Sequence, residues 1–143
     1  MVVDDARERL RDLSARLVRL HALLLDRERH AYEERHGSVT SWELLQLLLR
    51  DEQFVWLRSL STLMAQIDAL VDADEPVAAA DAQGLMRNVY RLLSSGESGA
   101  FQEKYRAALQ ESADVVMVHA GIAGTLRRQG VDALGGTGPS SEG

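Results

Sequence analysis

Apolar side chains recur at alternating steps of four and three residues along the last long segment of the chain. The stripe consists of Phe101, Tyr105, Ala108, Ser112, Val115, His119, Ile122 and Leu126. This spacing keeps the side chains on one face of an α-helix, whereas a half-buried strand needs alternation every two residues. The pattern predicts a single helix over about residues 100–128, with a histidine near the middle of its inner face.

Other segments carry the same kind of stripe, and almost nothing in the chain alternates with the period of a strand. Long helices are expected over about residues 4–36, 51–73 and 78–94, and a short helix over 42–50. Four long helices with short connections are typical of an up-and-down bundle. The sequence therefore predicts an all-α fold, namely an antiparallel four-helix bundle with one extra short helix. A single domain is expected over residues 1–130, followed by a disordered, glycine- and serine-rich tail over 131–143.

Two glycines refine this prediction. Gly37 follows the first long helix and is a natural residue to end it, because glycine adopts the left-handed conformation at little cost. Gly84 lies inside the helix expected over 78–94, where glycine is less favourable than alanine by about 1 kcal/mol. A close crossing with another helix would explain a glycine at this position.

The short segment 42–50 is apolar nearly all round, with Trp42 followed by five leucines. A helix of this kind is either buried on several sides or presents an exposed apolar face. Trp42 opens the segment and has two interpretations: it covers the end of the bundle, or it anchors a protein partner, since tryptophan is enriched at interface hot spots.

Composition and charge narrow the possible functions. The chain has no cysteine, which excludes disulfides, a thiol nucleophile and Cys-ligated metal sites. The net charge is −6, and the arginines of the first helix alternate with acids, so no basic face for nucleic acid is expected. No apolar run approaches the ~20 residues that a membrane span needs. With no signal peptide at the acidic start, a soluble, cytoplasmic protein is expected.

Four polar residues fall at inward or seam positions of the expected helices, namely His21, Glu28, Asp68 and His119. Imidazole and carboxylate groups inside a bundle are suitable ligands for a divalent metal such as iron, zinc or manganese. The competing interpretation is structural, because a half-buried histidine is commonly satisfied by a neighbouring carboxylate or carbonyl. A third interpretation is acid–base chemistry by His119 with a carboxylate partner, which would require a cleft and a perturbed pKa.

Established catalytic motifs are missing from the sequence. There is no Gly-x-Ser-x-Gly elbow and no P-loop, and the only lysine is Lys104. One Glu-x-x-His spacing occurs, at Glu33 and His36, whereas di-iron carboxylate bundles use that motif twice. We therefore predict no catalytic residues and no resident cofactor apart from the possible metal.

Several segments resemble a family of small, uncharacterised bacterial helical proteins. They are Leu20 to Arg29 with Tyr32-Glu33 and His36-Gly37, Phe54 to Ser61 with Ile67-Asp68, and Asp114 to Ala120. The resemblance covers roughly residues 17–122 and implies a bacterial, single-domain helical protein. It implies no activity, cofactor or site residue.

These observations lead to two hypotheses of different kinds. The first is a non-catalytic helical bundle that acts through protein–protein contacts or as a homodimer. The alternative is a metal or small-ligand binder that uses His21, Glu28, Asp68 and His119 inside the bundle.

Overall fold

The computed structural model describes residues 5–94 and 96–131, and all regular structure in these ranges is helical. The helices are α1 Asp5–His36, α2 Ser41–Arg50, α3 Glu52–Val55, α4 Arg58–Asp72, α5 Ala79–Ser94, α6 Ala100–Glu111 and α7 Ala113–Arg128. The predicted all-α class is therefore confirmed. The predicted disorder of residues 132–143 lies outside the described residues. No helix in the described part is long and apolar enough to cross a membrane.

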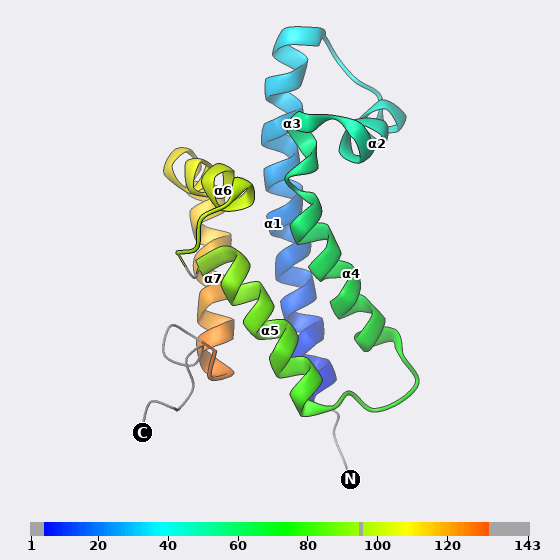
Figure 1. The fold of residues 1–143 in the computed structure, drawn as a ribbon, viewed down its shortest axis with the longest axis vertical. Coiled ribbons are helices and arrows are strands. Elements are labelled where there is room, and N and C mark those ends of the chain that lie inside the picture. The colour runs from blue at the N-terminus through cyan, green and yellow to red at the C-terminus, as the bar shows by residue number, and fades with distance from the viewer. Residues whose placement is uncertain (1–4, 95, 132–143) are drawn as a thin grey trace.

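Four of the helices, α1, α4, α5 and α7, pack side by side. Helix α1 contacts α4 on one side and α7 on the other, and α5 contacts both of these helices as well. Along the chain these four helices alternate in direction, and α6 crosses one end of α7 (Figure 1). Helix α2 stands out to the side of this group, next to α3, which it contacts.

The core lies between these four helices, and the stripe of α1 is its longest contributor. Leu10, Leu13, Leu17, Leu20 and Leu24 are all essentially inaccessible to solvent, as predicted from their spacing. They pack with buried residues of the other helices, including Ile67 of α4, Met86 of α5 and Ile122 of α7. Complete burial of a leucine contributes about 1.5–3 kcal/mol, so this seam is the main source of stability.

An arginine near the start of α1 closes the far end of α4. The guanidinium of Arg7 donates to the carbonyl of Val71, to that of Ala73 at 2.9 Å and to that of Glu75 at 2.6 Å. The last carbonyls of a helix have no partner within the helix, and they lie at the negative end of its dipole. Arg7 therefore caps α4 and fixes α1 against it.

The helix predicted over 51–73 is in fact divided in two by a tight turn at Trp56 and Leu57. The N–H of Leu57 bonds to the carbonyl of Phe54 at 3.1 Å, three residues back instead of four. Phe54, Trp56 and Leu57 are all buried. In a continuous helix Phe54 and Trp56 would point in nearly opposite directions, and the two rings are buried against different neighbours, Phe54 against Tyr32 and Trp56 against Phe101.

The single helix predicted over 100–128 is also wrong, because the chain turns at Ser112 between α6 and α7. Ser112 has extended backbone angles, and its hydroxyl accepts from the N–H of Val115 at 3.2 Å. Serine is among the preferred N-cap residues, which favours a new helix start here. The apolar members of the predicted stripe, such as Phe101 and Val115, are nevertheless buried.

The prediction for Gly37 is confirmed, whereas the one for Gly84 is not. Gly37 has a φ of +86° and follows the last residue of α1, as predicted. At Gly84 the expected close helix crossing is absent, because an added Cβ would meet nothing within 4 Å.

Val131 follows the last helix and packs into the core. Val131 is 1% exposed and belongs to the core, and its N–H bonds to the carbonyl of Leu126 at 2.8 Å. Gly130, with a φ of +81°, turns the chain so that Val131 folds back onto α7.

Candidate functional site

Helix α2 presents an exposed apolar face. None of its ten residues is buried, although six of them are tryptophan or leucine. Trp42 is 66% exposed, Leu45 45% and Leu49 53%. Because these positions are separated by three and four residues, they lie on one side of the helix. We call Trp42, Leu45 and Leu49 the α2 surface.

The α2 surface is carried by a well-formed helix, not by a frayed segment. Thr40 and Glu43 form a capping box, with the N–H of Glu43 donating to the Thr40 hydroxyl and the N–H of Thr40 donating to the Glu43 carboxylate. At the other end Arg58 donates to the carbonyl of Leu49 at 2.8 Å. These bonds at both ends stabilise the helix that carries the three apolar side chains of the α2 surface.

A small cleft of about 370 Å³ lies beside the α2 surface, between α2 and the end of α1. Tyr32, His36 and Val39 line it together with Trp42. The rings of Tyr32 and His36 have centroids 4.3 Å apart, so one wall is aromatic. The cleft extends the apolar character of the α2 surface toward α1.

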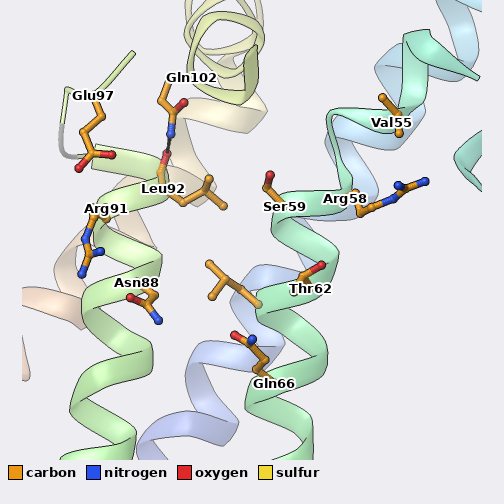
Figure 2. A pocket seen from close by; sticks show the side chains of 11 residues that line it. Val55, Arg58, Ser59, Thr62, Gln66, Asn88, Arg91, Leu92, Glu97 and Gln102 are labelled. Carbon is orange, nitrogen blue, oxygen red and sulfur yellow. Dashed lines mark hydrogen bonds between the residues drawn. The ribbon is translucent and has the colours of Figure 1, made fainter. Parts of the chain in front are cut away.

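A second hollow runs between α4 and α5, with a volume of about 630 Å³. Figure 2 shows Ser59, Thr62 and Gln66 on its α4 side and Asn88 on its α5 side. The amide of Gln102 donates to the carbonyl of Leu92 at 3.2 Å near one end of this groove. Its volume is in the range of ligand pockets, and none of the four residues predicted to bind metal lines it.

The two predicted site residues on α1 bond to partners on α3, on α4 and in the turn between them. Nε2 of His21 lies 3.0 Å from the hydroxyl of Ser61. The carboxylate of Glu28 accepts from the Trp56 indole N–H at 3.0 Å and from the Gln53 amide at 2.9 Å. Both of its oxygens are thus occupied by neutral donors, which makes Glu28 a structural acceptor for the turn that separates α3 from α4.

The other two predicted residues lie elsewhere in the fold. Asp68 is exposed on α4 and accepts from the hydroxyl of Ser14 at 3.0 Å. Nδ1 of His119 on α7 lies 2.7 Å from the hydroxyl of Tyr105 on α6. Its hydrogen-bond partner is thus a phenol, where the acid–base interpretation needed a carboxylate.

Burial determines the protonation of these groups. It lowers the pKa of His21 and of His119 below 6.5, because the charged imidazolium loses hydration. It raises the pKa of Tyr105 above its ordinary value of 10. Near neutral pH the Tyr105 hydroxyl is therefore the donor and the neutral imidazole of His119 the acceptor.

The described residues contain no group of three or more His, Asp or Glu side chains placed to hold a metal ion. No hydrogen bond or ion pair found in this part of the chain joins two of His21, Glu28, Asp68 and His119. The geometry therefore gives the predicted four-residue metal site no support. Each of the four side chains instead connects one helix to a neighbouring element.

Sequence reasoning missed the partners of these polar groups. Ser14, Gln53, Ser61 and Tyr105 are common residue types, and nothing in their spacing marks them as partners of a histidine or a carboxylate. For Trp42 the sequence left two interpretations open, because a leucine-rich helix of only ten residues is either buried or exposed on its apolar face; the structure places Trp42 66% exposed.

Comparison of the chain with protein-family models, with curated proteins and with solved structures gave no match. The resemblance to a bacterial family thus stays a prediction.

Proposed function

We propose that this protein is a non-catalytic helical protein that acts through protein–protein contacts, and that the α2 surface is its contact site. The observation that carries the proposal is the exposure of Trp42, Leu45 and Leu49 together on one short helix. Half of the large apolar residues found exposed in the described part of the chain are these three. A gathered apolar patch of this kind is typical of an interaction site, whereas single exposed apolar residues are ordinary.

The chemistry of the α2 surface agrees with this role. Anchors separated by three and then four residues are the spacing by which a helix binds a complementary apolar surface. Tryptophan is the residue type most enriched among interface hot spots. Glu43 and Arg50 are exposed at the border of the patch and supply the polar rim of a protein interface.

The proposal also covers the arrangement of the helices and the location of the protein in the cell. The antiparallel packing of α1, α4, α5 and α7 is interpreted as a four-helix bundle that serves as a scaffold for α2. A cytoplasmic location is also proposed, and the absence of cysteine from the sequence supports it.

Photo-crosslinking at position 42 tests this proposal. A benzophenone amino acid that replaces Trp42 should form a covalent adduct with a protein partner in cells that express the chain. The matched control is the same replacement at Met117, an exposed apolar residue of α7 (72% exposed). We expect a discrete adduct from position 42 and none from position 117. Equal labelling from both positions, or none from 42, would contradict the proposal.

Small-ligand binding is a second candidate, favoured by the groove between α4 and α5. Its walls carry hydroxyl and amide groups from Thr62, Gln66 and Asn88, next to the apolar side chain of Leu63. A hydrogen-bonding molecule with an apolar part suits this lining. NMR shifts confined to these residues in a screen of such compounds, and lost in Asn88→Leu, are the expected result. Shifts spread over the whole surface would contradict a specific site.

A further inference from the structure

Glu43 and Arg50 give the two ends of the α2 surface opposite charges. They are seven residues apart, which is close to two helical turns, so both lie along the same edge of the apolar stripe. Glu43 lies near the start of α2, and Arg50 is its last residue. Arg50 has no hydrogen bond or ion pair within the described part of the chain, and Glu43 uses one carboxylate oxygen, Oε1, in the capping box.

We propose that the partner of the α2 surface is a second copy of this chain, bound through its own α2 in the antiparallel direction. This deepens the proposed function and depends on it, because it names the occupant of the same face. A two-fold axis near Gln46 places Glu43 of each copy against Arg50 of the other. The same axis places Trp42 of each copy against Leu49 of the other, with Leu45 near the centre.

Charge complementarity selects both the occupant and its direction. In the antiparallel pair two Glu43–Arg50 contacts form, one at each end, since a two-fold interface repeats every contact. In a parallel two-fold pair this edge of the two helices lies on opposite sides of the interface, so no Glu43–Arg50 contact forms. The antiparallel pair also sets each helix dipole against the opposite end of the other. Each copy carries a net charge of −6 and repels the other at long range, so these local pairs are needed for association.

The size of the face fixes the expected strength of the dimer. Three apolar side chains from each copy form a small contact, below the ~1,200–2,000 Å² that stable complexes bury. The dimer is therefore expected to be reversible and to dissociate on dilution.

Charge exchange between the two positions tests this arrangement by sedimentation equilibrium over a wide range of concentrations. Glu43→Arg alone and Arg50→Glu alone each create like-charge contacts and should weaken self-association tenfold or more. Mixing the two variants should restore association as a heterodimer, because the exchanged charges then oppose one another. Glu103→Arg and Arg87→Glu change charge by the same amounts at exposed positions on other helices and should leave the dimer unchanged.

Folding of the variants is controlled separately. Glu43→Arg removes half of the capping box, so Glu43→Gln, whose side-chain oxygen still accepts from Thr40, removes the charge alone. It should weaken the dimer less than Glu43→Arg while leaving the helical circular dichroism unchanged. Weaker association of Glu43→Arg with no recovery in the mixture would overturn the antiparallel pairing.

The absence of cysteine allows a direct test of direction. A single cysteine from Gln46→Cys lies near the two-fold axis, where the Cα atoms of two helices approach closely enough for a disulfide. Mild oxidation should give a covalent dimer for Gln46→Cys but not for Arg50→Cys, and the absence of a Gln46→Cys dimer would contradict the proposed two-fold axis.

The two proposals fail in different ways. A strict monomer at every concentration, with a position-42 adduct to a different protein, would overturn self-association and leave α2 as the contact site. A monomer with no adduct from position 42 would overturn both.

Discussion

Helices α1 and α2 have similar apolar side chains but differ in how far these are buried. Both carry leucines at helical spacing, but the stripe of α1 is fully buried and no residue of α2 is. Helix α1 lies between α4 and α7, whereas α2 contacts α3 at the side of the fold. An apolar stripe therefore predicts which face of a helix avoids water. It does not predict whether the same chain or another one covers that face.

The strongest test of this contrast removes one leucine from each helix. Leu17→Ala in α1 leaves a cavity at a fully buried site and should lower the free energy of unfolding by about 2–5 kcal/mol. Leu45→Ala in α2 should change it by less than about 0.5 kcal/mol, because the side chain is already 45% exposed. Urea denaturation of dilute protein measures both. Similar losses for the two variants would show that α2 is part of the core.

Two arginines give a second comparison of α1 with α2, with smaller expected changes in the free energy of unfolding. Arg7→Gln removes a charged donor from the carbonyls that end α4 and should cost about 1–3 kcal/mol in urea denaturation. Arg50→Gln, at the end of α2, should be within about 0.5 kcal/mol of the unmodified monomer. A large loss for Arg50→Gln in the dilute monomer would mean that Arg50 stabilises α2 itself, contrary to the role proposed for it between copies.

The stripe of α1 could be predicted from sequence because its spacing is unbroken and each leucine meets the core. The breaks at Trp56-Leu57 and at Ser112 could not. Serine fits both a helix interior and a cap, and the difference is about 1 kcal/mol, so packing decides between them. Phe54 and Trp56 are buried against different neighbours, Tyr32 and Phe101, and these contacts exist only in the folded chain.

The site was predictable to a smaller extent. His119 was expected on an inner face, and it is half-buried, but its contact with Tyr105 depends on the turn at Ser112. Glu28 depends in the same way on the turn that brings the Trp56 indole to it. For Trp42 the sequence left two interpretations open, and only the fold, in which α2 stands at the side, shows that it is exposed.

A pH dependence of stability should arise in the buried region and is expected to be smaller than the effects above. Burial lowers the folded-state pKa of His21 and His119 below 6.5. Between the folded and unfolded pKa values the unfolded chain binds more protons, so the free energy of unfolding falls as pH falls below about 6.5. Above that pH these histidines add no dependence.

Thermal unfolding at several pH values measures this effect. His21→Gln and His119→Gln should each flatten the profile below pH ~6.5. A profile that stays as steep in the double variant as in the unmodified protein would assign the dependence to other groups.

The smallest expected effect compares two glycines with equal space around them. An added Cβ meets nothing within 4 Å at Gly84 or at Gly37, so packing is the same for both. Gly84 lies inside α5 with helical geometry, and Gly84→Ala should raise the free energy of unfolding by about 0.5–1 kcal/mol through helix propensity. Gly37 has a φ of +86°, and Gly37→Ala should lower it by about 1–2 kcal/mol, because a Cβ strains the left-handed conformation. Opposite signs in urea denaturation would show that backbone conformation governs both positions, and a loss at Gly84 would contradict the expected gain in helix propensity.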